Sequence, residues 1–259
     1  MIRVIKNIIP SKIQDTLFSF VSAVYWLLHP QKRPKIAWKS NGIWCVYDLK
    51  SRKTYYVPSK SQVGRGNRQK HAEKIERYTL MDFVEIETGD TVIDVGAFIG
   101  EFSIPAQEIG ATVYAIEPAP VSFHCLTKNT EHIDSINCYQ TSIWNENTTM
   151  TFSIGEDQTE NSLFDVDNGK LVSKEVIDTQ TIDSFLNEND INSVDFLKVE
   201  AEGAEPEVLE GAITAEMEKI AVDAGAERYG KETVDAVSDI LVEAGYEVRK
   251  SGPIVFGRK

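Results

Sequence analysis

The sequence predicts an α/β fold with a seven-stranded, mostly parallel sheet and helices on both faces. The main indication of this fold is residues 91–118, where an apolar strand, a glycine turn, a helix and a second apolar strand follow one another. Residues 194–212 repeat the change from apolar strand to helix. The pairing of 246–250 with 254–258 as a closing antiparallel hairpin completes the count of seven strands.

The N-terminal third precedes this sheet and has a different pattern. Residues 13–28 are apolar and aromatic near helical spacing, which predicts a helix too short to span a bilayer. This helix either packs on the protein or a partner subunit, or lies in a membrane interface. Two strands flank Asn41-Gly42, a strong hairpin signal. The further elements expected here are a third strand at 54–58, a basic loop at 59–70 and a helix at 71–84.

The remaining elements follow in chain order and suggest three parts. We expect 1–34 to be a basic and apolar helix, 35–84 a small β-meander with a basic loop and a lead-in helix, and 85–259 the main domain. In the main domain we expect helices at 102–109, 121–130, 181–186, 205 onward and 232–244, strands at 111–116, 136–139, 194–199 and 219–224, and extra strands at 150–154 and 174–178 around a polar loop at 155–169.

Composition limits the class of protein. A chain of 259 residues with 42% hydrophobic residues can bury a full core. Its three cysteines and four histidines are scattered, so we expect no disulfide framework and no metal ligands. The same usage of cysteine predicts a cytoplasmic location.

The net charge of −13 is unevenly spread. Residues 1–80 hold 16 Lys+Arg and 4 Asp+Glu, against 11 and 36 in the rest. This asymmetry indicates an anionic partner or attraction between the two parts.

The glycine turn at 96–100 indicates a nucleotide-type cofactor. Only Gly96 and Gly100 are present, with Ala97 and Phe98 between them, whereas dinucleotide sites favour G-x-G-x-x-G. S-adenosylmethionine (SAM) has no phosphate and needs a less open turn. The turn therefore favours SAM, with another nucleotide or a chance α/β turn as alternatives. Glu117, at the end of the second strand, is placed to accept hydrogen bonds from two ribose hydroxyls.

Carboxylates follow two later strands of the predicted sheet. Ligands of open α/β sheets bind at the carboxyl ends of strands, so Glu200, Glu202 and Asp223 are expected near the cofactor. Methyl transfer requires alignment of donor and acceptor and removal of a proton. Glu200 is the preferred base or orienting group, and Glu202 and Asp223 are second choices. Glu205 and Glu207 open a helix and suit a capping role, and Lys198 can neutralise the acidic pair.

The motifs together resemble the FkbM family of SAM-dependent methyltransferases. They are VIDVGAFIGEFS, VYAIEPAP, NSL, TID and DFLKVEAEGAEPEVLEGA, in this order over residues 85–250. The resemblance implies a Rossmann-like class I methyltransferase fold. It also implies that Asp94, Gly96, Ala97 and Gly100 surround the methionine part of SAM, with Phe98 in the same turn, Glu117 and Pro118 at the ribose, and Ser142 in the segment beside the adenine. The family usually has Asn at position 98 and Asp at position 200.

The resemblance implies O-methylation of a sugar or glycoconjugate, with a small-molecule or lipid-linked sugar as substrate. A nucleic-acid methyltransferase is one alternative, although the acidic main domain disfavours a polyanion. A non-catalytic SAM-binding or membrane-associated interaction module is another. Residues 1–34 are expected to make peripheral contact with anionic membranes if any part does.

Overall fold

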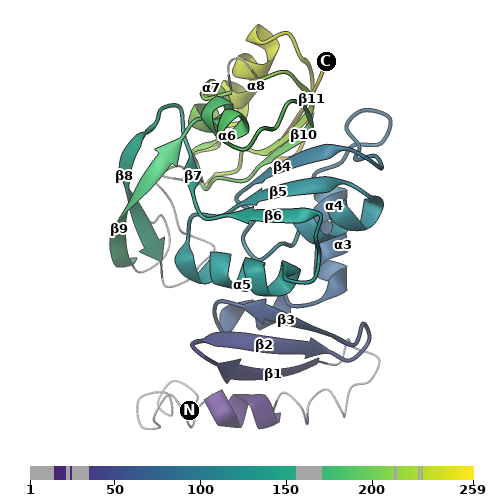
Figure 1. Cartoon of the computed structure of the whole chain (residues 1–259), viewed down its shortest axis with the longest axis vertical. Coiled ribbons are helices and arrows are strands. Elements are labelled where there is room, and N and C mark those ends of the chain that lie inside the picture. Colours follow the sequence, from purple (N-terminus) through teal and green to yellow (C-terminus); the bar gives the residue numbers. More distant parts are fainter. Residues whose placement is uncertain are drawn as a thin grey trace. The chain divides into compact units, whose positions relative to one another are not determined.

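The computed structural model describes residues 15–21, 24, 35–155, 171–212, 215–226, 228 and 230–259, and the side chains of 68–70 are not described. The chain forms two compact units, Met1–Lys70 and His71–Lys259 (Figure 1). We expected the main domain to begin at residue 85. The earlier boundary has a physical reason, because Tyr78, Phe83 and Val84 are buried in one core cluster with the first strand of the main sheet.

The first unit contains a three-stranded antiparallel meander. It consists of β1 (Lys35–Ser40), β2 (Ile43–Asp48) and β3 (Lys53–Val57), in that order. The turn between β1 and β2 has positive φ angles at Asn41 (48°) and Gly42 (88°), as a two-residue hairpin requires. The predicted hairpin and the third strand are therefore confirmed. Of the predicted helix at 13–28, residues 15–21 and 24 are helical and the rest lie outside the described residues.

The segment between the meander and the main sheet differs from expectation. The stretch predicted as a basic loop contains the 3₁₀ helix η1 (Ser61–Gly64) and the start of α3 (Arg68–Arg77). The predicted helix at 71–84 is wrong at its C-terminal end. After Arg77 the chain turns through Asp82, whose φ of 61° is incompatible with a helix, and Leu80 forms a bridge with Val84.

The second unit is built on the seven-stranded sheet that the sequence predicts. Its strand order is β12-β13-β11-β10-β4-β5-β6. β4, β5, β6, β10 and β11 run parallel to one another, whereas β13 is antiparallel to both β11 and β12. The bounds are β4 (Thr91–Val95), β5 (Thr112–Ile116), β6 (Ile136–Tyr139), β10 (Val194–Val199), β11 (Met217–Asp223), β12 (Glu247–Ser251) and β13 (Ile254–Arg258).

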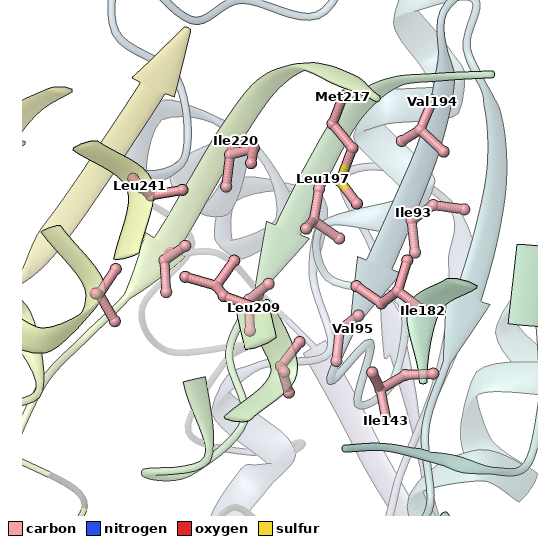
Figure 2. Close-up of a cluster of buried hydrophobic side chains, with 14 of the residues drawn as sticks. Ile93, Val95, Ile143, Ile182, Val194, Leu197, Leu209, Met217, Ile220 and Leu241 are labelled. Atoms are coloured by element: carbon pink, nitrogen blue, oxygen red, sulfur yellow. The ribbon is translucent and has the colours of Figure 1, made fainter. Parts of the chain in front are cut away.

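Helices cover both faces of this sheet because its strands are apolar on both sides. On β4, Val92 joins one buried cluster while Ile93 and Val95 join the other, as the alternation of side chains along a strand requires. Figure 2 shows the second of these clusters. The first cluster includes residues of α4 (Ser103–Ile109) and α5 (Pro120–Thr130), and the second includes residues of α6 (Ile182–Glu188), α7 (Glu205–Glu210) and α8 (Val234–Glu243).

A separate three-stranded sheet follows β6. It consists of β7 (Ser142–Ile143), β9 (Leu171–Gln180) and β8 (Thr148–Gly155), in that spatial order. The two extra strands expected from alternation are present and longer than predicted. The polar loop expected between them lies outside the described residues except for Gly155. In the chain, β7 follows the C-terminal end of β6. The three-stranded sheet therefore begins at the carboxyl edge of the main sheet (Figure 1).

Gly96 is a position where the backbone geometry leaves no room for a side chain. Its φ is 74°, and a Cβ added there would lie 1.8 Å from the carbonyl oxygen of Glu200. Gly245 is a matched control because its φ of 86° is similar but nothing lies within 4 Å of the added Cβ. Gly96→Ala should lower the free energy of unfolding by more than about 3 kcal/mol, and Gly245→Ala by about 1 kcal/mol. Chemical denaturation measures both, and equal losses would contradict the close approach.

Candidate functional site

The turn between β4 and α4 contains three residues in left-handed conformations. The φ angles are 74° at Gly96, 53° at Phe98 and 89° at Gly100. The amides of Gly96 and Ala97 donate to the Ile116 carbonyl at 3.0 and 2.9 Å, which ties the turn to the end of β5. A bulky residue at positive φ is strained, whereas Asn tolerates this region. The Asn that the FkbM family usually has at position 98 therefore suits the backbone better than Phe98.

Glu117 lies against this turn, as its predicted role requires. Its two carboxylate oxygens accept hydrogen bonds from the backbone amides of Phe98 (2.8 Å) and Ala119 (2.9 Å). Burial raises the pKa of Glu117 to about 7, although both amides and Lys198 favour the ionised form. Each carboxylate oxygen has a second lone pair, so Glu117 can still accept hydroxyl donors. The structure thus brings together the glycine turn and the end of β5.

Asp94 lies beneath the turn and is fully buried. It accepts a hydrogen bond from the Ser103 hydroxyl (2.5 Å) and forms an ion pair with Lys198 Nζ at 2.9 Å. Lys198 Nζ also donates to the carbonyls of Val95 (3.1 Å) and Gly96 (2.8 Å). Burial opposes the charge, but Asp94 and Glu200 outweigh it and raise the pKa of Lys198. Asp94 therefore contributes to the site by holding the turn, and Lys198 neutralises both neighbouring carboxylates.

Glu200, the preferred catalytic residue, is held by two lysines. Both of its oxygens accept from Lys74 Nζ, at 2.7 and 2.8 Å, and Lys198 Nζ lies 3.4 Å from Oε2. Burial would raise the pKa of Glu200, but the charges of Lys198 and Lys74 lower it well below the usual value. The carboxylate is therefore ionised and only weakly basic, which suits it better for orienting a hydroxyl than for removing a proton.

Asp223, at the end of β11, is buried beside this pair. Its Oδ2 accepts from Arg77 and from the Tyr78 hydroxyl (3.2 Å). Its Oδ1 is buried and has no hydrogen-bond partner among the described residues. Burial first and Glu200 second raise the pKa of Asp223, against the charges of Arg77 and Lys74. Asp223 is therefore the stronger base of the two carboxylates that face α3.

The side chains that α3 and the following turn contribute to the site were not predicted from the sequence. Lys74, Arg77 and Tyr78 contact Glu200 or Asp223 across more than 100 residues of sequence. Their spacing of i, i+3 and i+4 places them on one helical face, which is the signal that the sequence contained. It could not be assigned because α3 is polar along its whole length and its partner strands follow far later in the chain.

Glu202 lies in the loop between β10 and α7, where its φ is 49° and that of Gly203 is 93°. Glu205 holds this loop. It is fully buried and accepts from the amides of Ala201 (3.1 Å) and Gly203 (2.9 Å) and from the Thr233 hydroxyl (3.2 Å). Burial nevertheless raises the pKa of Glu205 to about 7. Glu207 forms an ion pair with Arg228, whose Nε also donates to Gly203. Both glutamates lie in the first turn of α7, where the expected capping role remains a prediction.

A polar pocket of about 470 Å³ opens beside Pro118. Its lining includes amide, hydroxyl and carboxylate side chains, among them Gln140, Thr141, Asn147, Asp178 and Gln180. Ser142 is buried in β7 and paired with β9, so its neighbour Thr141 lines the pocket in its place. The Gln180 side-chain amide donates to Thr141 at 3.1 Å. This pocket has the polarity that a hydroxyl-rich ligand requires.

The donor set fits SAM at its ribose. Glu117 offers a carboxylate beside the glycine turn, where it can accept hydrogen bonds from ribose hydroxyls. Metal binding has no comparable support. Within the described ranges, no group of three or more His, Cys, Asp or Glu side chains is arranged to hold an ion.

The raised pKa of Glu205 makes stability depend on pH. A carboxyl group whose pKa rises on folding stabilises the protein below its unfolded pKa, and this contribution is lost as the pH rises through the folded pKa. Between pH 5 and 8, the wild type should lose on the order of 2 to 3 kcal/mol more unfolding free energy than Glu205→Gln. Denaturation at both pH values measures the difference. The same loss in both proteins would show that Glu205 is ionised throughout.

Comparison with known proteins adds relatives whose matches are partial. The chain is 48% identical over 56 residues to 31-O-demethyl-FK506 methyltransferase FkbM of Streptomyces tacrolimicus, covering 21% of this chain and 22% of that protein. It is 28% identical over 143 residues to Methyltransferase 1 of Beauveria bassiana, covering 46% and 57%. The chain thus spans between a fifth and three fifths of these relatives. A solved structure, the fibrillarin pre-rRNA processing protein of Methanococcus jannaschii, aligns with a TM-score of 0.47 at 13% identity over 86% of this chain and 97% of that one.

A sequence profile supplies the family. The family described as the methyltransferase FkbM domain matches residues 94–248, which is more than half of the chain. The matched region begins at the buried aspartate of β4 and ends in β12, so it includes the glycine turn, Glu117, Glu200 and Asp223. The chain therefore belongs to the FkbM methyltransferase family, whose cofactor is S-adenosylmethionine.

Proposed function

We propose that this protein transfers a methyl group from SAM to a hydroxyl group of a sugar or glycoconjugate. The observation that carries the proposal is the position of Glu117, whose carboxylate is held against the glycine turn by the amides of Phe98 and Ala119. The name of the Streptomyces relative describes an O-methyltransferase, which supports a hydroxyl as the acceptor. The match covers 22% of the length of that relative, so the acceptor of this chain is proposed and not inferred from the relative's name alone.

The residues of the chain divide the chemical task among them. SAM supplies an electrophilic methyl group, so the protein needs chiefly to bind, to orient and to accept one proton. Glu117 binds the ribose hydroxyls. Glu200 orients the acceptor hydroxyl, because its ion pairs keep it charged and fixed. Asp223 is the proposed proton acceptor through Oδ1, since its pKa is raised and that oxygen has no partner among the described residues. Glu202 is the alternative in the adjoining loop.

The charge of the second unit disfavours a nucleic acid as the acceptor. The second unit, residues 71–259, contains 13 Lys+Arg and 38 Asp+Glu, and such an excess of negative charge repels a polyanion. A soluble or lipid-linked sugar in the cytoplasm is the acceptor that we propose.

Calorimetric titration with SAM and S-adenosylhomocysteine tests the cofactor role of Glu117. Its ionised form accepts two ribose hydrogen bonds, so affinity should fall about tenfold from pH 8 to pH 6 as the group with a pKa of about 7 takes up a proton. Glu117→Gln should bind more weakly at pH 8 and lose this dependence. Glu243→Gln, an exposed carboxylate of α8, is the control and should retain it. Unchanged binding by Glu117→Gln would contradict the assignment.

Turnover with a panel of sugars, glycolipids, amines and RNA tests the acceptor class and the role of Glu200. Release of S-adenosylhomocysteine should depend on a hydroxylated sugar. With that sugar, Glu200→Gln should lower kcat about a hundredfold because the hydroxyl is no longer oriented, while SAM affinity changes less than about threefold. Asp223→Asn should lower kcat and remove the rise in activity with pH that ionisation of this carboxylate causes. Full turnover by Glu200→Gln, or turnover with amines or RNA alone, contradicts the respective part of the proposal.

A further inference from the structure

Residues 15–21 and 24 of the first unit are helical and expose an apolar stripe. Leu17, Phe20, Val21 and Val24 are 56, 70, 56 and 38% exposed. Their spacing of i, i+3, i+4 and i+7 places them on one face of a helix. Scattered exposed apolar residues need no explanation, but four on one face form a surface that water solvates poorly. No helix within the described residues is long and apolar enough to cross a bilayer.

The other side of this segment is fixed to the meander. The Phe18 ring packs edge-on against Trp44, with ring centroids 5.3 Å apart, and Lys60 Nζ lies 4.2 Å from the Phe18 centroid. Lys39 forms an ion pair with Asp15 at 3.4 Å. Because Phe18 faces the sheet, the stripe beginning at its neighbour Leu17 lies on a different side of the helix. The stripe therefore belongs to a helix that is already packed, and folding of the unit leaves it exposed.

The charge of the same unit indicates what covers the stripe. Residues 1–70 hold 14 Lys+Arg and only two carboxylates, Asp15 and Asp48. Asp15 pairs with Lys39, and Asp48 is buried, where it accepts from the Lys50 amide and the Ser51 hydroxyl. The unit therefore carries a net charge of +12 (14 − 2). An apolar helical face on a strongly cationic unit is complementary to a surface that is both apolar and anionic.

We infer that this apolar stripe docks the protein on anionic lipid membranes. The helix lies in the plane of the interface, with Leu17, Phe20, Val21 and Val24 inserted at the level of the acyl boundary, while the net positive charge of the unit attracts it to the anionic headgroups. Both contributions are needed, since a short apolar stripe or a basic patch alone gives weak, reversible binding. The inference rests on the first unit alone and does not depend on the proposed methyl transfer.

Cosedimentation of the full-length protein with vesicles tests the inference. The vesicles consist of phosphatidylcholine alone or of phosphatidylcholine mixed equally with phosphatidylglycerol. Wild type should partition to the mixed vesicles and lose this binding at high salt. The double variant Phe20→Ser/Val21→Ser should bind about tenfold more weakly, because two inserted apolar side chains are lost. Val172→Ser/Val176→Ser is the matched control, since these valines of β9 are 63 and 76% exposed in the second unit, and it should bind like wild type.

Three results would overturn the inference. If the wild type stays in solution with the mixed vesicles, the protein has no surface that binds anionic membranes. Equal binding by wild type and Phe20→Ser/Val21→Ser would assign the attraction to charge alone. A change in sedimentation mass of that variant without vesicle binding would show that the stripe contacts a second copy of the chain. Circular dichroism and SAM titration of each variant establish that it is folded, and failure of SAM binding in wild type bears only on the proposed function.

Discussion

The buried ammonium group of Lys198 is the interaction on which the site depends. It lies between β4 and β10, where it pairs with Asp94 and donates to two carbonyls at the start of the glycine turn. A buried cation with three oxygen partners is well compensated, whereas the loss of any one partner would leave charge unpaired in the core. The conformation of the turn and the position of Glu200 therefore share one cause.

The seven-stranded sheet could be predicted because β4, β5, β10 and β11 are rich in apolar residues, and each ends in or is followed by a glycine or a carboxylate. Glu117, Glu200 and Asp223 could be expected at one edge for the same reason, since parallel strands place their carboxyl ends together. The hydrogen bond from the Phe98 amide to Glu117 shows that the glycine turn and the end of β5 lie beside each other, as expected. The roles of these residues in binding and catalysis remain predictions.

The sequence was less informative where a residue depends on distant partners. Nothing in the local pattern shows that Lys74 pairs with Glu200 or that Arg77 and Tyr78 contact Asp223. Those contacts nevertheless decide which carboxylate is ionised and which is the stronger base. The end of α3 was also misplaced, because the left-handed Asp82 is not a typical helix-ending residue. Ser142 was assigned from its segment, whereas the pairing of β7 with β9 buries it and leaves Thr141 at the pocket.

Glu117 has a further consequence through its raised pKa. A carboxyl group with a pKa of about 7 retains its proton in roughly half of the molecules at neutral pH. A ligand that requires the ionised carboxylate must therefore displace protons when it binds. Cofactor loading becomes a proton-releasing reaction, and the heat measured for it includes the ionisation heat of the buffer that takes up those protons. The enthalpy of binding is then a property of the protein and its medium together.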